Sequence, residues 1–359
     1  MGPWIFGRRV DLAVFVGPTL AGLALASLVP LGVVSPGKLP TWAWVALVVS
    51  VDVAHVHATL FRTYLDAAEL RRRPLTYTLV PIGCLAAGVA LFSQGPTWFW
   101  RVLAYVAVFH FVRQQAGWVA IYRAKSGPST VVDRVVDDAA IYLSTGVPLL
   151  AWHASLPRGF SWFVDGDFVA IAAPRAVTVA AWVALAAALA AFVARQVWRA
   201  RRALPVSAGK IAVVASTAVS WCVGIEVVDH DLGFTALNVL PHGVPYFVLL
   251  HAYARARSET RPASVVASVV RAGIPAFLCV LLALAVAEEA LWDRLVWRDH
   301  ANLFGWLPQP DAARWLWLVV PLLTLPQSVH YVLDALLWRR GDTGPEQARA
   351  LGFAATLRG

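Results

Sequence analysis

A series of about ten apolar segments, each close to 20 residues long, constrains this chain more than any other feature. A helix needs about 20 apolar residues to cross the hydrocarbon core of a bilayer. Inside the bilayer every backbone polar group has to be satisfied within the protein, and a helix achieves this with its own residues. The pattern therefore predicts an all-α, polytopic integral membrane bundle of about ten transmembrane helices. The expected spans are 10–34, 41–65, 75–94, 98–122, 135–157, 176–198, 209–227, 232–254, 264–288 and 315–338.

The composition argues against a soluble globular domain. Apolar residues make up 59% of the chain and charged residues 14%, whereas soluble domains have about 45–50% and about 25%. The net charge of +9 comes from basic residues in short loops between apolar runs, which favours a role in membrane orientation over nucleic-acid binding. The three cysteines are far apart and form no CxxC pair, so neither a disulfide framework nor a thiolate metal site is indicated.

The loop charges predict the orientation of the bundle. With ten spans and a cytoplasmic N-terminus, every basic cluster falls on one side, as the positive-inside rule requires. Both ends of the chain are then cytoplasmic, residues 1–338 form the bundle, and residues 339–359 form a cytoplasmic tail. We expect the protein to lie in a bacterial cytoplasmic membrane. The clusters are Arg8/Arg9, Arg71 to Arg73, Arg123/Lys125/Arg134, Arg199/Arg201/Arg202/Lys210, Arg255/Arg257/Arg261 and Arg339/Arg340.

Polar residues gather in four of the expected spans. An ionisable residue at the centre of a spanning helix costs about 2.5–3.5 kcal/mol on insertion scales, so each one is a functional candidate. These residues lie in the second, fourth, eighth and tenth spans. In that order they carry Asp52, His55 and His57; His110, Arg113, Gln114 and Gln115; Asn238, His242 and His251; and Gln327, His330 and Asp334.

The spacing of these residues places one histidine and one polar neighbour on the same face of each helix. Asp52 and His55 are three residues apart, and the pairs His110/Gln114, Asn238/His242 and His330/Asp334 are four apart. The four spans are all even-numbered and therefore run in the same direction. Counting to the arginine that ends each span puts the four imidazoles roughly 10–20 Å from the inner surface. The sequence thus predicts four histidines in one layer.

Imidazole and carboxylate side chains in this arrangement point to a transition-metal site. Both are common ligands of divalent transition metals, and polar groups beside a ligating histidine hold its ring in place. The alternative is that the histidines only form hydrogen bonds between packed helices. His57 is expected to face elsewhere. The candidate ligands are His55, His110, His242, His330, Asp52 and Asp334, and the candidate supporting residues are Gln114, Asn238, Arg113, Tyr246 and Tyr331.

The placement of histidines on several spanning helices, together with the fragment Pro241-His242-Gly243, resembles the membrane-embedded histidine-cluster non-haem iron enzymes. These are the fatty acid desaturases and hydroxylases and the bacterial carotene-cleaving dioxygenases of the Brp/Blh type. The HxxxH and HxxHH boxes of the desaturases do not occur, and the nearest features are His55-Val56-His57 and the His110/Gln114 pair. The resemblance implies iron as the metal and an oxygen-using oxidoreductase. It also implies a lipid-soluble substrate that enters from the bilayer, and an electron donor as a further partner.

Two other classes of protein stay open. A proton-coupled transporter would use intramembrane Asp, His and Arg residues as an ion relay, and its helices would be broken by prolines such as Pro241, Pro245 and Pro326. A membrane haem protein would use pairs of histidines at similar depth as axial ligands.

Overall fold

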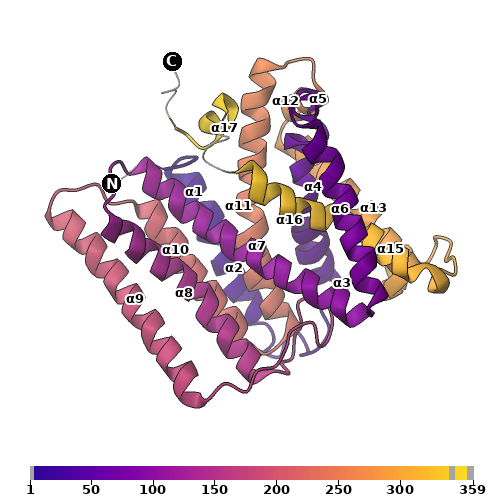
Figure 1. The fold of residues 1–359 in the computed structure, drawn as a ribbon, viewed down its shortest axis with the longest axis horizontal. Coiled ribbons are helices and arrows are strands. Elements are labelled where there is room, and N and C mark those ends of the chain that lie inside the picture. The colour runs from indigo at the N-terminus through magenta and orange to yellow at the C-terminus, as the bar shows by residue number, and fades with distance from the viewer. Residues whose placement is uncertain (1–3, 339–343, 354–359) are drawn as a thin grey trace. The chain divides into compact units, whose positions relative to one another are not determined.

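The computed structural model describes residues 4–338 and 344–353 of the 359-residue chain, and within these ranges it is all-α, without a strand (Figure 1). Two compact units can be distinguished. Unit 1 comprises Met1–Leu39, Val108–Pro245 and Leu351–Phe353, and unit 2 comprises Pro40–Ala107, Tyr246–Ala350 and Ala354–Gly359. The division falls inside helices α7 (Pro96–Lys125) and α11 (Asp231–Thr260), so each of these helices contributes residues to both units.

Eight helical segments among the described residues are long and apolar enough to cross a membrane, which supports an integral membrane protein. The other two expected spans, 98–122 and 135–157, lie in α7 and α8 (Val131–Ser155), which are helices but are not among the eight. The count of ten and the orientation therefore stay predictions. The eight segments are Arg8–Ala26, Thr41–Arg62, Pro74–Ser93, Arg175–Arg201, Ala208–Val227, Asp231–Thr260, Ile274–Trp297 and Ala313–Leu337.

The expected ninth span, 264–288, has different bounds in the structure. The chain forms a short helix α12 (Val265–Arg271), turns at Gly273, and begins α13 (Ile274–Trp292) only after the turn. Gly273 has φ 98°, a conformation that glycine adopts without steric cost, and Pro275 lies in the first turn of α13, where its missing N–H has no helical partner to lose. Because α13 continues to Trp292, the helix extends beyond the expected end at residue 288 and includes Glu289.

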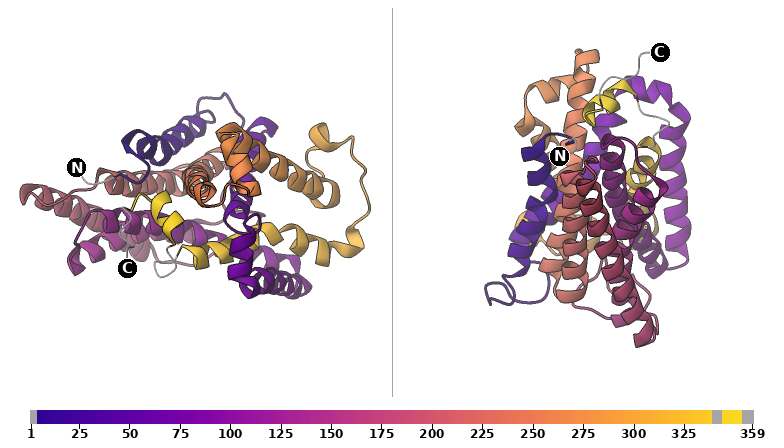
Figure 2. Two further views of the ribbon diagram at one scale, coloured as in Figure 1. Left: turned by 90° about the horizontal axis from the view of Figure 1, so that it is seen from above. Right: turned by 90° about the vertical axis from the view of Figure 1, so that its left-hand side faces the viewer.

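Unit 1 consists of α1 (Arg8–Phe15), α2 (Gly17–Ala26), α8, α9 (Arg175–Arg201), α10 (Ala208–Trp221), the π-helix η3 (Cys222–Val227) and parts of α7 and α11. Helix α8 packs against α9 and α10, and α10 packs against α1 and α2 (Figures 1 and 2). Glycines permit the closest approaches, as is common between spanning helices. A Cβ atom at Gly22 would lie 2.9 Å from Leu237 Cδ2, and one at Gly224 would lie 2.8 Å from Leu237 Cβ.

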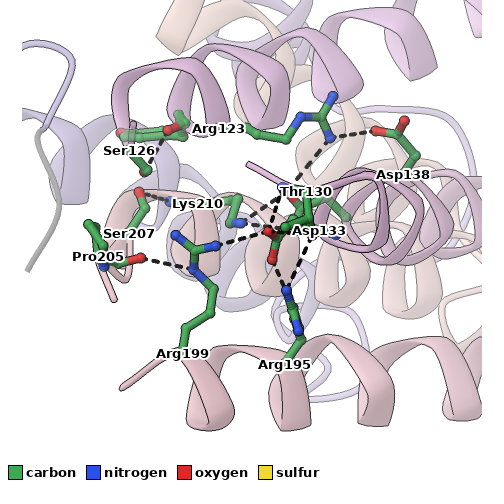
Figure 3. A network of polar contacts seen from close by, with 12 residues as sticks. Arg123, Ser126, Thr130, Asp133, Asp138, Arg195, Arg199, Pro205, Ser207 and Lys210 are labelled. Carbon is green, nitrogen blue, oxygen red and sulfur yellow. Dashed lines mark hydrogen bonds and ion pairs between the residues drawn. The ribbon is translucent and has the colours of Figure 1, made fainter. Parts of the chain in front are cut away.

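A network of ion pairs joins the ends of α8, α9 and α10 (Figure 3). Asp133 accepts hydrogen bonds from Arg195 Nε at 2.8 Å and from Arg199 Nη1 at 3.0 Å, and its side chain is 3% exposed. Although burial alone would raise the pKa of Asp133, the hydrogen bonds from Arg195 and from Thr130 hold it below the usual range. The carboxylate is therefore stabilised in its charged form.

Unit 2 begins with α3 (Thr41–Ala43) and the π-helix η1 (Trp44–Val53), which leads directly into α4 (Ala54–Ala58) and the 3₁₀-helix η2 (Thr59–Arg62). Helices α5 (Ala67–Arg72) and α6 (Pro74–Ser93) follow, and α6 packs against α15 (Leu316–Leu323) and α16 (Leu325–Leu337). Helix α13 packs against η1 and α4. The remaining short elements are η4 (Asp293–Trp297), α14 (Ala301–Phe304) and η5 (Ala313–Trp315).

Part of the expected cytoplasmic tail is a helix that contacts the rest of unit 2. Helix α17 (Pro345–Ala350) presents Gln347 to Arg62 Nη2 at 2.8 Å, and Glu346 accepts a hydrogen bond from Arg257 Nη1 at 2.8 Å. The rest of the expected tail, residues 339–343 and 354–359, lies outside the described residues.

The Asp133 network makes a testable contribution to stability. Replacing Asp133 with Asn leaves Arg195 and Arg199 without a charged partner, and we expect a loss of about 3 kcal/mol in the free energy of unfolding at pH 7. Because the pKa of Asp133 is lowered in the folded protein, its contribution is present above the ordinary pKa and is lost as the pH falls through the folded value. The difference between wild type and D133N in thermal unfolding should therefore shrink towards low pH. D138N, at a carboxylate with a 41% exposed side chain, is the control and should change the unfolding midpoint much less.

Candidate metal centre

Four buried histidines, one from each of four helices, form a group that could hold a metal ion. His55 lies on α4, His110 on α7, His242 on α11 and His330 on α16. Their exposed fractions are 1%, 6%, 1% and 2%, and one ring nitrogen of each lies within 4.8 Å of the others. These are the four histidines that the helical spacing places in one layer.

In unit 1, His110 and His242 face each other, with ring centroids 5.1 Å apart and an interplanar angle of 80°. The ring of Phe111 stacks on His242 at 3.5 Å, with the two planes 9° apart. Phe111 therefore covers one face of the His242 imidazole.

Prolines explain how the backbone beside His242 is held. Pro245 has no N–H, so the carbonyl of Pro241, four residues earlier, loses its usual helical donor. Gln115 Nε2 donates to that carbonyl at 3.4 Å, and Gln115 Oε1 accepts a hydrogen bond from Thr217 at 3.1 Å. A side chain of α7 thus replaces a missing backbone bond of α11, on the turn that carries the histidine.

In unit 2, His55 and His330 pack edge to face, with centroids 5.0 Å apart and an angle of 85°. Tyr246 lies against both rings, 5.9 Å from His55 and 5.3 Å from His330. Tyr246 follows His242 by one turn of α11, so one face of this helix presents a histidine and the tyrosine that touches the other two imidazoles.

A chain of hydrogen bonds fixes the ring orientation of His330. The Oδ1 atom of Asp334 accepts from Trp338 Nε1 at 2.6 Å and from the Tyr246 hydroxyl at 2.8 Å. Because the Tyr246 proton is directed to Asp334, the Tyr246 oxygen accepts from Thr59 Oγ1, 3.0 Å away. Thr59 in turn accepts from His330 Nδ1 at 2.7 Å.

The direction of this chain determines the tautomer of His330. With the proton on Nδ1, the lone pair of His330 lies on Nε2, the atom left for a metal. His55 is held in the same way, because its Nδ1 lies 3.2 Å from the carbonyl oxygen of Val51. In two of the four rings, therefore, Nδ1 is engaged by the protein, which fixes the orientation of the ring.

The two carboxylates expected as ligands lie beside the histidines. Asp334 occupies the end of the hydrogen-bond chain, and Asp52 lies 3.8 Å from His55 Nδ1 with a 23% exposed side chain. Neither belongs to the group of atoms within 4.8 Å. Their assignment as metal ligands stays a prediction.

The expected supporting residues lie in different surroundings. Tyr246 contacts two imidazoles as described, and Tyr331 is buried next to His330. Arg113 is exposed and hydrogen-bonds to Tyr142 on α8. In the described part of the chain, the side-chain amide of Gln114 has no hydrogen-bond partner, and Asn238 donates to the carbonyl of Phe234. Arg113, Gln114 and Asn238 thus make no hydrogen bond to the four histidines.

Two residues that contact the site histidines, Thr59 and Phe111, and one partner of His57, Glu288, were not identified from the sequence. Thr59 follows His55 by one helical turn, which is the same spacing that identifies Gln114 beside His110. A threonine is common in spanning helices, however, and its hydroxyl group does not mark it as a partner in the way that an amide or a carboxylate does. Phe111 gives no signal that separates it from other apolar residues of α7. Glu288 lies 3.0 Å from Nε2 of His57, and it was missed because the apolar run was expected to end there. His57 is not one of the four histidines of the group, and its expected orientation away from them stays a prediction.

Comparison with protein-family models, with curated proteins and with solved structures finds no match. The function therefore has to be argued from the buried four-histidine group in this helical structure.

The hydrogen-bond chain leads to a prediction about Thr59. T59V keeps the shape of the side chain but removes the acceptor for His330 Nδ1, and the affinity for a transition metal should fall about 10- to 100-fold. T63V, one turn later, is the matched control, because the Thr63 hydroxyl donates only to the backbone carbonyl of Thr59. Both affinities can be measured by competition with a chelating dye. Equal affinities in T59V, T63V and wild type would contradict the assigned chain.

Proposed function

We propose that this protein is a membrane-embedded, metal-dependent oxidoreductase, in which His55, His110, His242 and His330 hold a divalent transition metal, iron being favoured. The observation that carries the proposal is the approach of four buried imidazole nitrogens to within 4.8 Å of one another. Neutral imidazole is a common ligand of divalent transition metals, so a group of four such nitrogens is a suitable ligand set.

The dimensions of the group support this assignment. Metal–imidazole bonds of about 2.0–2.1 Å place ligand nitrogens about 3.4 Å apart in a tetrahedral site and about 4.2 Å apart across an octahedral one. The limit of 4.8 Å is slightly wider, so a small inward movement of the rings would complete the coordination.

The ligand set supports iron and oxygen chemistry. Four neutral nitrogen ligands leave two positions of an octahedral ion open, as non-haem iron oxygenases require. Bound iron would supply the activation of O2. The residues of the chain orient the rings, through Thr59 and Tyr246, and exclude water. A substrate that reaches a site among apolar spans is lipid-soluble, and an oxygenase of this kind draws electrons from a donor protein or small molecule.

A haem group fits this arrangement less well. Two axial ligands of a haem lie on opposite sides of a flat macrocycle that already fills the other four positions around the iron. Four imidazole nitrogens within 4.8 Å of one another occupy the space that the macrocycle needs. The geometry favours a single ion.

Metal content tests the site directly. Protein purified in detergent should contain a transition metal by elemental analysis, and H110A and H330A should each lower the bound metal at least about tenfold, because each removes one ligand. H251A is the control: His251 is on α11, nine residues after His242, and its ring packs against Phe277. Metal content that is unchanged in both H110A and H330A would defeat the ligand assignment.

Oxygen consumption tests the reaction class. Protein loaded with Fe(II) in lipid nanodiscs should consume O2 faster when a reductant and a bacterial lipid extract are both added, and H330A should lose this increase. The same protein loaded with Zn(II), which is redox-inactive, is the control. An oxygen-consumption rate that does not depend on lipid in the iron-loaded protein would contradict a lipid-soluble substrate.

A proton-coupled transporter is the second candidate, favoured by the charged residues of unit 2. His57 Nε2 lies 3.0 Å from Glu288 Oε2, and both residues belong to segments long and apolar enough to span a membrane. Intramembrane histidine and carboxylate pairs are typical of ion relays. Purified protein that is free of transition metal but acidifies or alkalinises the lumen of liposomes would select this function.

A further inference from the structure

A polar pocket in unit 1 is not explained by the proposed metal centre. It is open to solvent and lies where α7 ends, α8 begins, α9 ends and α10 begins (Figure 3). Three cations and three hydroxyl groups contribute to its lining. The lining residues are Arg123, Ser126, Gly127, Pro128, Ser129, Asp133, Arg199, Pro205, Ser207 and Lys210.

The carboxylates around the pocket do not neutralise its cations. Arg123, Arg195, Arg199 and Lys210 pair with Asp133, Asp137 and Asp138, so four cations face three carboxylates and leave a net charge of +1. The cations are held in place by these pairs. Lys210 Nζ, for example, lies 2.8 Å from Asp137 Oδ1, with side chains that are 6% and 1% exposed.

Two guanidinium groups keep donors for a further acceptor. Arg199 uses Nε for the carbonyl of Pro205 and Nη1 for Asp133, and Arg123 uses Nη1 for Asp138. Within the described residues, neither Nη2 atom makes a hydrogen bond to the protein. Ser129, on the exposed loop between α7 and α8, adds a hydroxyl group with no partner among the described residues. Guanidinium and hydroxyl donors of this kind match the oxygens of a phosphate group.

The surroundings of the pocket indicate the depth at which such a phosphate would lie. The first turns of α8 and the stretch around the end of α9, which supply lining residues, also carry exposed apolar side chains, and Arg195 stacks on the indole of Trp198 at 4.0 Å. An apolar belt next to tryptophan and arginine is typical of the boundary between acyl chains and head groups. Basic pockets between helix ends on the cytoplasmic side bind the head groups of anionic lipids. The exposed residues are Val131, Val132, Val135, Val197, Trp198 and Leu204.

We propose that this pocket binds a phosphate group, supplied by the head group of an anionic phospholipid. Arg199 and Arg123 would donate to the phosphate oxygens, and the valines of α8 would lie along an acyl chain. The site is separate from the four histidines and does not depend on the function assigned to them.

Ser129 offers a test that leaves the ion pairs intact. Phosphatidylglycerol binding to the purified protein can be followed by native mass spectrometry, with phosphatidylcholine as the neutral probe. S129E should weaken phosphatidylglycerol binding about fivefold, because one like charge enters the pocket, and S129R should strengthen it. S258E adds the same charge at a different helix end, on α11, and should leave binding unchanged.

Competition with inorganic phosphate separates the two sources of the ligand. Displacement of phosphatidylglycerol only at high phosphate concentration supports a lipid head group, whereas tight binding of inorganic phosphate that S129E abolishes supports a phosphate site filled from solution. Equal phosphatidylglycerol binding by wild type, S129E and S129R would overturn the proposal. An equal loss in S258E would overturn it as well, because binding would then follow the general positive charge of this side.

Discussion

The chain of hydrogen bonds from His330 through Thr59 and Tyr246 to Asp334 is the interaction on which the arrangement of the site depends. A neutral imidazole can carry its proton on either nitrogen, and only one choice directs a lone pair at a shared ligand. The Asp334 carboxylate determines which nitrogen of His330 is protonated, because a carboxylate can only accept hydrogen bonds and therefore sets the direction of the whole chain. A buried acid is costly among apolar helices, and here two donors, Tyr246 and Trp338, reduce that cost. The acid thus acts on the histidine through Tyr246 and Thr59.

Two other buried polar groups also obtain their contacts from side chains that are distant in sequence. Gln115 donates to a carbonyl that a proline has left without its helical donor. Arg62 lies 2.8 Å from Gln347 and 3.8 Å from the ring of Trp338, so a buried guanidinium is covered by an amide and an indole. In both cases a residue far away in sequence supplies the missing contact. Because the two partners are far apart in sequence, no local sequence pattern predicts these contacts.

The helical class and the four histidines could be predicted from the sequence, because both depend on periodic features. Apolar length predicts a spanning helix, and a spacing of three or four residues predicts a shared face. The bounds of the ninth span could not be predicted in this way, because the break at Gly273 depends on a backbone conformation and not on hydropathy. Thr59 could not be predicted for a different reason. A threonine hydroxyl can equally well hydrogen-bond to a backbone carbonyl of its own helix, so its partner is known only once the neighbouring helices are placed. Arg113, predicted to be a supporting residue, hydrogen-bonds to Tyr142, which is 29 residues away in sequence.

The π-helix η1 has a consequence for how this chain can vary. It spans Trp44–Val53 and ends just before the turn that carries His55 and Thr59. A π-helix winds more residues into each turn than an α-helix, so its length sets the rotation of everything that follows. Losing or gaining one residue there would turn the following segment by roughly 80–90°, somewhat less than the step of about 100° in an α-helix. His55 and Thr59, whose hydroxyl group orients His330, would then both face away from the other histidines. Insertions and deletions in this stretch are therefore far less tolerable than substitutions.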